Sequence, residues 1–219
     1  MRPAAPAASL ILIRDRPLSA PEILMVRRGA ALVFAADAYV FPGGRVDPAD
    51  YVAAARHPDA TGDREDAAAR IAAVRETEEE TGIADAADVA ELVAFARWCP
   101  PADAPRRFDT RFYLARARAD LPDPVADGVE STIAFWATAR DVLEACRAGR
   151  GRAIFPTRML LERLAQFGGF DEARHQAERL PVRIISPWIE QRGESAWLCI
   201  PEDAGYPTTA EPLETASRF

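Results

Sequence analysis

Cysteine is scarce in this chain of 219 residues, and long apolar runs are absent. Cys99, Cys146 and Cys199 lie far apart, so neither a zinc motif nor a disulfide framework is indicated, and we expect buried thiols in a reducing compartment. The apolar run at 9–13 is too short for the core of a signal peptide, and no stretch approaches the roughly 18 apolar residues of a membrane span. We therefore expect a soluble, cytoplasmic protein without a membrane partner.

Positive charge is also in deficit. Lysine and arginine together number 27 against 34 acidic residues, which gives a net charge of -7. A nucleic-acid polymer as partner is disfavoured, because neutralising its phosphates requires a basic surface. A single nucleotide is not excluded, since a few local arginines and a metal ion can hold it. With 49% hydrophobic residues the chain can bury the core of one large domain, so we expect a single domain over 1–219.

A helix is predicted from about residue 64 to residue 81. Asp63 is a plausible N-cap, with Asp66 at the third position as a weaker form of the capping box, and Gly82 can end the helix in a left-handed conformation. One side of this helix is apolar, so it can dock on a sheet and leave the opposite face turned outward. The residues of the apolar side are Ala67, Ile71, Val74 and Thr81.

Three carboxylates crowd the opposite face of this helix. Glu76, Glu79 and Glu80 are spaced i, i+3 and i+4, and no lysine or arginine follows them within a turn. A solvated helix face is the ordinary interpretation of such a run, but it predicts interleaved positive charges, which are missing here. Carboxylate oxygens are the ligands that Mg²⁺ and Mn²⁺ prefer, so the pattern favours a site for one of these ions.

The run RETEEETGI at 75–83 resembles the second half of the Nudix box. That box is the signature of hydrolases that cleave nucleoside diphosphates linked to another moiety. The context supports the resemblance, because the run FPGG at 41–44 lies upstream, just after an apolar segment, where the family places its glycine loop.

The spacing departs from the family pattern. Gly44 lies 31 residues before Arg75, whereas the family glycine lies about 14 before its arginine, so we expect an insertion at 45–62. Counted eight residues back from Arg75, the first glutamate of the family falls on Ala67. An interrupted box of this kind resembles the branch that contains peroxisomal coenzyme A diphosphatases and their bacterial relatives.

The resemblance implies a Nudix-type α/β/α sandwich with a mixed sheet, and alternating strand and helix patterns along the chain independently indicate an α/β fold. It also implies hydrolysis of a pyrophosphate bond by metal-activated water, with Mg²⁺ or Mn²⁺ as cofactor. The residues implied as catalytic are Arg75, Glu76, Glu79 and Glu80, and those implied as metal ligands are Glu76, Glu79, Glu80 and Gly44. Which glutamate acts as base is left open, and Glu130 is a further candidate outside the box.

Candidate substrate contacts come from the glycine loop and from arginines near strands. They are Arg28, Gly43, Gly44, Arg107 and Arg111, with Arg106 as a further cation. The expected substrate is a nucleoside diphosphate derivative, with coenzyme A or an acyl-coenzyme A as first choice, because its 3′-phosphate requires additional cations. The alternatives are ADP-ribose, a dinucleoside polyphosphate, or a catalytically weak nucleotide-binding regulatory module. A homodimer is left open.

The C-terminal part adds helices and short strands to this arrangement. Two amphipathic helices are expected at about 157–179. Two short strands are expected at 182–185 and 196–200, paired across the turn at 191–194.

Overall fold

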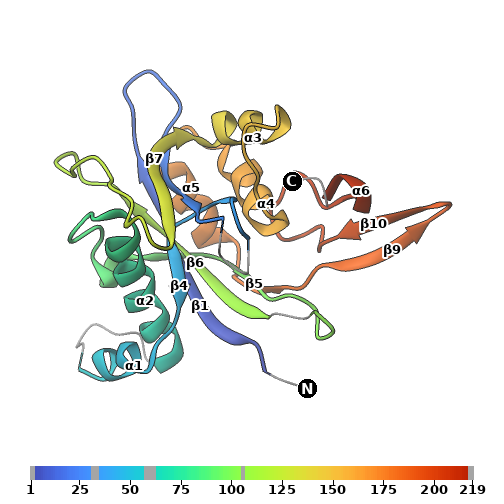
Figure 1. Cartoon of the computed structure of the whole chain (residues 1–219). Helices are drawn as coiled ribbons and strands as arrows, with labels where there is room; N and C mark the ends of the chain where they lie inside the picture. Colours follow the sequence, from blue (N-terminus) through green and yellow to red (C-terminus); the bar gives the residue numbers. More distant parts are fainter. Residues whose placement is uncertain (1–2, 31–34, 57–62, 105–106, 217–219) are drawn as a thin grey trace.

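The computed structural model describes residues 3–30, 35–56, 63–104 and 107–216. Its centre is an eight-stranded sheet with the order β3-β2-β1-β6-β5-β8, in which β4 also pairs with β1 and β7 with β2 (Figure 1). The pairs β1–β6 and β5–β8 are parallel and the others antiparallel, so the sheet is mixed. Its strands are β1 (Ala5–Arg14), β2 (Glu22–Arg28), β3 (Tyr39–Val40), β4 (Gly43–Arg45), β5 (Val93–Trp98), β6 (Phe108–Arg116), β7 (Ser131–Thr138) and β8 (Ile184–Ile185).

Strand β1 shows why this sheet is covered on both faces. Leu10 and Leu12 belong to one buried cluster and Ile11 and Ile13 to another, because successive side chains of a strand point to opposite faces. A strand that is buried on both sides reads as a continuous apolar run, and SLILI in β1 is such a run.

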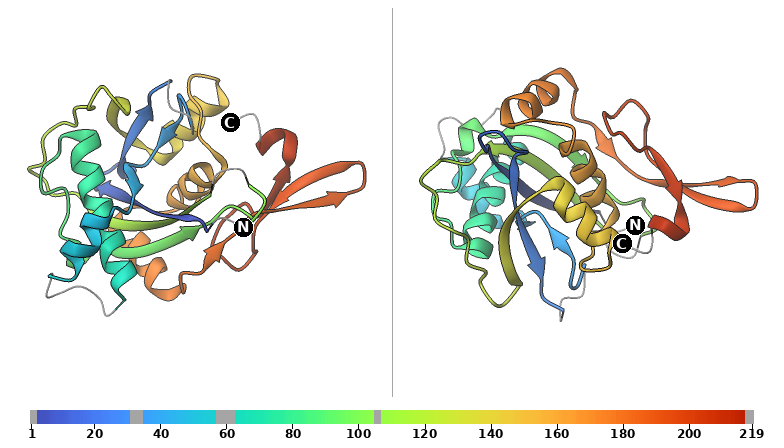
Figure 2. Two further views of the ribbon diagram at one scale, coloured as in Figure 1. Left: turned by 60° about the horizontal axis from the view of Figure 1, so that its bottom comes forward. Right: turned by 90° about the horizontal axis from the view of Figure 1, so that it is seen from above.

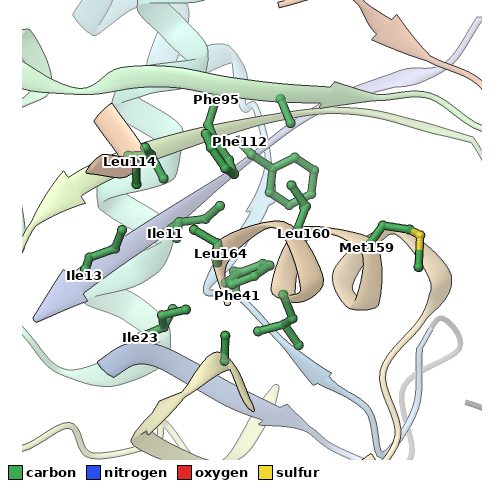
Figure 3. Close-up of a cluster of buried hydrophobic side chains, with 14 of the residues drawn as sticks. Ile11, Ile13, Ile23, Phe41, Phe95, Phe112, Leu114, Met159, Leu160 and Leu164 are labelled. Carbon is green, nitrogen blue, oxygen red and sulfur yellow. The ribbon is translucent and has the colours of Figure 1, made fainter. Parts of the chain in front are cut away.

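Helices form a layer on each face of the sheet, which confirms the predicted α/β/α sandwich (Figure 2). One layer holds α1 (Pro48–Ala54) and α2 (Arg64–Thr81), followed by a 3₁₀ turn at Val89–Glu91. The other holds α3 (Ala139–Arg147), α4 (Phe155–Leu164) and α5 (Phe170–Arg179). Figure 3 shows Leu160 and Leu164 of α4 against Ile11, Phe41 and Phe112 of the sheet.

The C-terminal region builds a second, three-stranded sheet and ends in α6 (Leu213–Ala216). Its strands are β9 (Trp188–Arg192), β10 (Ser195–Cys199) and β11 (Ala210–Pro212). The predicted pairing of 182–185 with 196–200 is therefore wrong. A tight turn at Gly193 (φ 61°) sets Arg192 opposite Ser195, so the strand directly before the turn pairs with β10, and β8 completes the edge of the main sheet beside β5.

Buried polar contacts attach this C-terminal region to the main sheet. The indole N–H of Trp98 donates to the Tyr206 hydroxyl at 2.9 Å, and Arg158 of α4 forms a buried ion pair with Glu211 of β11. Each described helix is too short or too polar to cross a bilayer.

Candidate active site

Helix α2 has the bounds that the sequence predicts. It spans Arg64–Thr81, the Asp63 carboxylate caps its first turn by accepting from the backbone N–H of Glu65 at 2.9 Å, and Gly82 ends it with φ 67°. The expected capping-box role of Asp66 is wrong. Its carboxylate instead accepts hydrogen bonds from Arg70 at 2.6 Å and from the Tyr113 hydroxyl at 2.8 Å, because helix packing brings these stronger donors close to it.

The acidic face of α2 does not look outward as expected. The Glu80 side chain is only 4% exposed and that of Glu76 15%, whereas that of Glu79 is 58% exposed. Strand β4 covers the face: the backbone N–H of Gly43 donates to Glu80 Oε2 at 3.0 Å. At Gly44, a Cβ atom would lie 2.4 Å from the Glu76 carboxylate, so only glycine allows this close approach. The predicted glycine loop therefore lies directly against the predicted acidic face.

Burial changes the proton affinity of the two inner glutamates. Desolvation raises the pKa of Glu80 to about 7, although the Gly43 N–H and the Arg28 guanidinium oppose the shift. The pKa of Glu76 is also raised, mainly by burial, with Arg75 opposing and the nearby charges of Glu79 and Glu130 adding to it. Repulsion among carboxylates is therefore present in this site, as the spacing of the glutamates predicts.

Arg75 relieves part of that repulsion. Its Nη1 atom lies 2.9 Å from Glu76 Oε1 and 2.9 Å from Glu79 Oε2. No cation follows the glutamates within a turn, but Arg75 precedes Glu79 by four positions, and on a helix such a residue is an equally close neighbour. Arg75 is therefore an ion-pair partner of two of the three glutamates.

Asp50 is a residue that the sequence analysis missed. Both carboxylate oxygens accept from Arg75, at 3.0 Å from Nε and 3.0 Å from Nη2, and the side chain is only 2% exposed. The first carboxylate of the family pattern lies six residues after its glycine, and six residues after Gly44 is Asp50. Counting backward from Arg75 gives Ala67 instead, which is buried against the sheet.

A cavity of about 430 Å³ opens over this part of the sheet. Arg28, Gly43, Gly44, Glu76 and Glu130 all contribute to its wall. The complete set of lining residues is Ala7, Ser9, Arg28, Ala35, Val40, Phe41, Gly43, Gly44, Arg45, Asp47, Glu76, Trp98, Pro100, Phe108, Thr110, Phe112, Glu130, Ile154, Pro156 and Thr157. The cavity thus joins a charged wall at the glycine loop to an aromatic wall on β5 and β6.

Two of the predicted arginines, Arg107 and Arg111, do not line this cavity. Arg111 lies at the N-terminal end of α2, where its guanidinium is 3.2 Å from Asp66 and 3.4 Å from Glu65. Arg107 donates from Nε to the backbone carbonyl of Pro100 at 3.2 Å. Arg106 lies outside the described residues. Among the predicted arginines that the structure describes, Arg28 alone lines the cavity, and its Nη1 lies 3.9 Å from Glu80 Oε1.

The donor set of the acidic face fits a hard divalent cation. Its ligands are carboxylate oxygens, and the buried Glu80 Oε1 has no hydrogen-bond partner among the described residues. Within the described ranges, no three acidic, histidine or cysteine side chains are already gathered as a metal cluster, since Arg75 holds Glu76 and Glu79. Arg75 contacts Glu76 through Oε1 and Glu79 through Oε2, so the second oxygen of each carboxylate can bind a cation while Arg75 stays in place.

Comparison with known proteins gives one family match. A model of the NUDIX domain matches residues 3–157, and no curated protein matches. A crystal structure of a NUDIX hydrolase from Alicyclobacillus acidocaldarius is similar, with 29% identity and a TM-score of 0.72 over 80% of this chain and 97% of that one. The NUDIX domain of Shewanella oneidensis NrtR, solved with ADP ribose, has 15% identity and a TM-score of 0.49 over 76% of this chain and 88% of that one.

Proposed function

This chain belongs to the NUDIX domain family and is a Nudix-type hydrolase, and on that premise we propose how its site acts on a nucleoside diphosphate derivative. We propose that Glu76, Glu79 and Glu80 hold divalent cations, Mg²⁺ or Mn²⁺, with the Gly44 backbone carbonyl as a further oxygen ligand. The observation that carries the proposal is one cavity wall in which Arg28, the glycine loop and Glu76 lie together over the buried Glu80.

The protein groups have distinct tasks in this proposal. Arg28, held on the cavity wall at the end of β2, binds a phosphate of the substrate, because a guanidinium suits phosphate oxygens. The glycines let the diphosphate approach the carboxylates closely. When bound, a divalent cation neutralises the bridging phosphates and lowers the pKa of water. Glu130 lines the same cavity and accepts the proton of the attacking water, and Arg75 orients Glu76 and Glu79.

Coenzyme A or an acyl-coenzyme A is the substrate we propose. The interrupted box and the sequences around 24–28 and 41–47 resemble the coenzyme A diphosphatase branch. Because Arg107 and Arg111 do not line the cavity, we assign the extra 3′-phosphate to Arg45, an exposed residue beside the glycine loop that does line it. We set aside the alternative of a catalytically weak regulatory module, because Asp50 lies six residues after Gly44, where the family has its first carboxylate, and accepts two hydrogen bonds from Arg75.

A substrate panel tests this proposal. The ratio kcat/KM is compared for coenzyme A, 3′-dephospho-coenzyme A, ADP-ribose and diadenosine polyphosphates with Mg²⁺ or Mn²⁺. If ADP-ribose or a dinucleotide is preferred by more than about tenfold, roughly 1.4 kcal/mol of transition-state binding, the coenzyme A assignment fails and the hydrolase assignment stands. Arg45→Gln should reduce kcat/KM for coenzyme A more than for its 3′-dephospho form. An equal loss on both substrates would exclude Arg45 as the 3′-phosphate contact.

A further inference from the structure

Strands β9 and β10 form a hairpin that projects from the body of the molecule (Figures 1 and 2). All residues of β9, Trp188–Arg192, are exposed, with Trp188 at 44% and Ile189 at 62%. Because side chains alternate along a strand, these two apolar residues lie on opposite faces of the hairpin. Strand β11 pairs with the other side of β10 at Trp197–Cys199, so β9 is the outer strand. Exposed apolar side chains on both faces of such a strand favour a partner that covers them.

The outer edge of β9 is open. Among the described residues, β9 pairs only with β10. Arg192 and Ser195 flank the two-residue turn, and residues in that position exchange both backbone hydrogen bonds, so the alternate residues Ile189 and Gln191 direct their N–H and C=O groups to the open edge. An edge of this kind is a template for another strand. The sequence WIEQR contains no proline, and its two charges, Glu190 and Arg192, are opposite in sign.

The charges of β9 identify the strand that fits this edge. We propose that β9 pairs antiparallel with β9 of a second copy of this chain, about a two-fold axis at Gln191. Within one chain Arg192 Nε lies 2.9 Å from Glu190 Oε1. In this register Glu190 also faces Arg192 of the second copy, and Arg192 faces its Glu190, so the two ion pairs join into one network of alternating charge. A two-fold axis at Glu190 would instead set two carboxylates against each other. With the axis at Gln191, the outward-pointing N–H and C=O groups of Gln191 also pair with those of Gln191 in the second copy.

The small size of the contact limits the affinity of the dimer. Two edges of this length, with the exposed parts of Trp188 and Ile189, cover less than the roughly 800 Å² per partner of a standard interface. We therefore expect a reversible dimer with a dissociation constant on the order of micromolar, which is independent of the hydrolase activity. Sedimentation velocity of the full chain between about 1 and about 200 µM should show the sedimentation coefficient rising from monomer to dimer.

Charge reversal tests the register. Glu190→Arg makes both positions positive and Arg192→Glu makes both negative, so each variant alone should be monomeric over the same range. An equimolar mixture of the two should form a heterodimer, since every facing pair is then opposite in charge. Glu178→Arg, on the exposed side of α5, is the matched control and should dimerise as the wild type does. Circular dichroism of all three variants should match the wild type, and the melting temperature should fall by only about 2–4 °C, because each variant removes one exposed ion pair, Arg174–Glu178 or Arg192–Glu190.

Two results would overturn the proposal. A wild-type chain that stays monomeric at the highest concentration leaves β9 without a second copy as partner. A wild-type dimer that persists in both single variants, or single variants that fail to associate when mixed, assigns the contact to another surface or another register.

Discussion

The substitution Gly44→Ala should change the geometry of the acidic site while leaving the stability of the fold nearly unchanged. A Cβ atom at this position would lie 2.4 Å from both Cδ and Oε2 of Glu76, and 2.6 Å from its Oε1. Ordinary contacts of such atoms begin near 3.4 Å, so in Gly44→Ala the Glu76 carboxylate must move by about 1 Å. The atoms that must move are the end of a flexible side chain, and β4 itself can stay in place.

The expected result is a folded protein with greatly reduced activity. Moving Glu76 weakens its contact with Arg75, whose side chain is 27% exposed, and such a pair contributes about 1 kcal/mol or less. For a chain of this length that corresponds to a melting temperature lower by roughly 2–4 °C. A displacement of about 1 Å in a catalytic group, in contrast, commonly costs about 10²-fold in rate. We expect kcat/KM to fall by about that factor at saturating Mg²⁺.

Gly43→Ala provides the comparison at the neighbouring residue. There a Cβ atom would lie 2.4 Å from the backbone carbonyl oxygen of Ala8 and 2.6 Å from the Cα of Ser9, both in the central strand β1. Backbone atoms of a buried strand cannot move aside cheaply, so we expect a loss of about 3 kcal/mol or more in unfolding free energy. Thermal denaturation and steady-state kinetics of both variants are the assays. Wild-type kcat/KM in Gly44→Ala would refute the argument that the position of Glu76 controls activity.

Four further predictions concern the acidic residues. Glu79→Gln and Glu80→Gln should each lower turnover by roughly 10²-fold with an unchanged circular dichroism spectrum, and wild-type turnover in both would exclude the acidic helix as the active site. Saturating Mn²⁺ should raise the melting temperature, since at about 100-fold excess over its dissociation constant a bound ion adds about 2.7 kcal/mol to the unfolding free energy. The melting temperature of Glu76→Gln should rise less. An equal rise in both proteins would exclude Glu76 from the metal site. Burial raises the pKa of Glu80 to about 7, so the folded state binds this proton more tightly than the unfolded chain does. In EDTA, the unfolding free energy should therefore fall by about 3 kcal/mol as pH rises from about 4.5 to about 7. Urea titrations at several pH values should show a flatter profile for Glu80→Gln, and an identical slope would contradict the assignment. Asp50→Asn should lower both kcat/KM and the melting temperature, since it removes the buried charge that holds Arg75, and unchanged metal-dependent kinetics would show that this contact is dispensable.

Local pattern in the sequence was sufficient for the features that depend on neighbouring residues. The bounds of α2 follow from Asp63 and Gly82, which cap a helix through their own backbone and side-chain geometry. The apolar run at 9–13 fits the central position of β1, because a strand covered on both sides buries the side chains of both its faces. The glycine loop and the glutamate run are each short local patterns, and together they identified the family.

Only the tertiary structure decided how these elements meet. Packing of β4 on α2 buries Glu80 and thereby shifts its pKa, although the helix pattern alone turns the same face toward solvent. Asp50 reaches Arg75 across 25 residues of sequence, and no periodicity encodes such a contact. The sequence alone makes Arg111 a candidate phosphate ligand. In the fold, carboxylates at the N-terminal end of α2, away from the three glutamates, surround its guanidinium. A sequence specifies which residues share a face of one element, whereas burial and charge pairing depend on the element that covers that face.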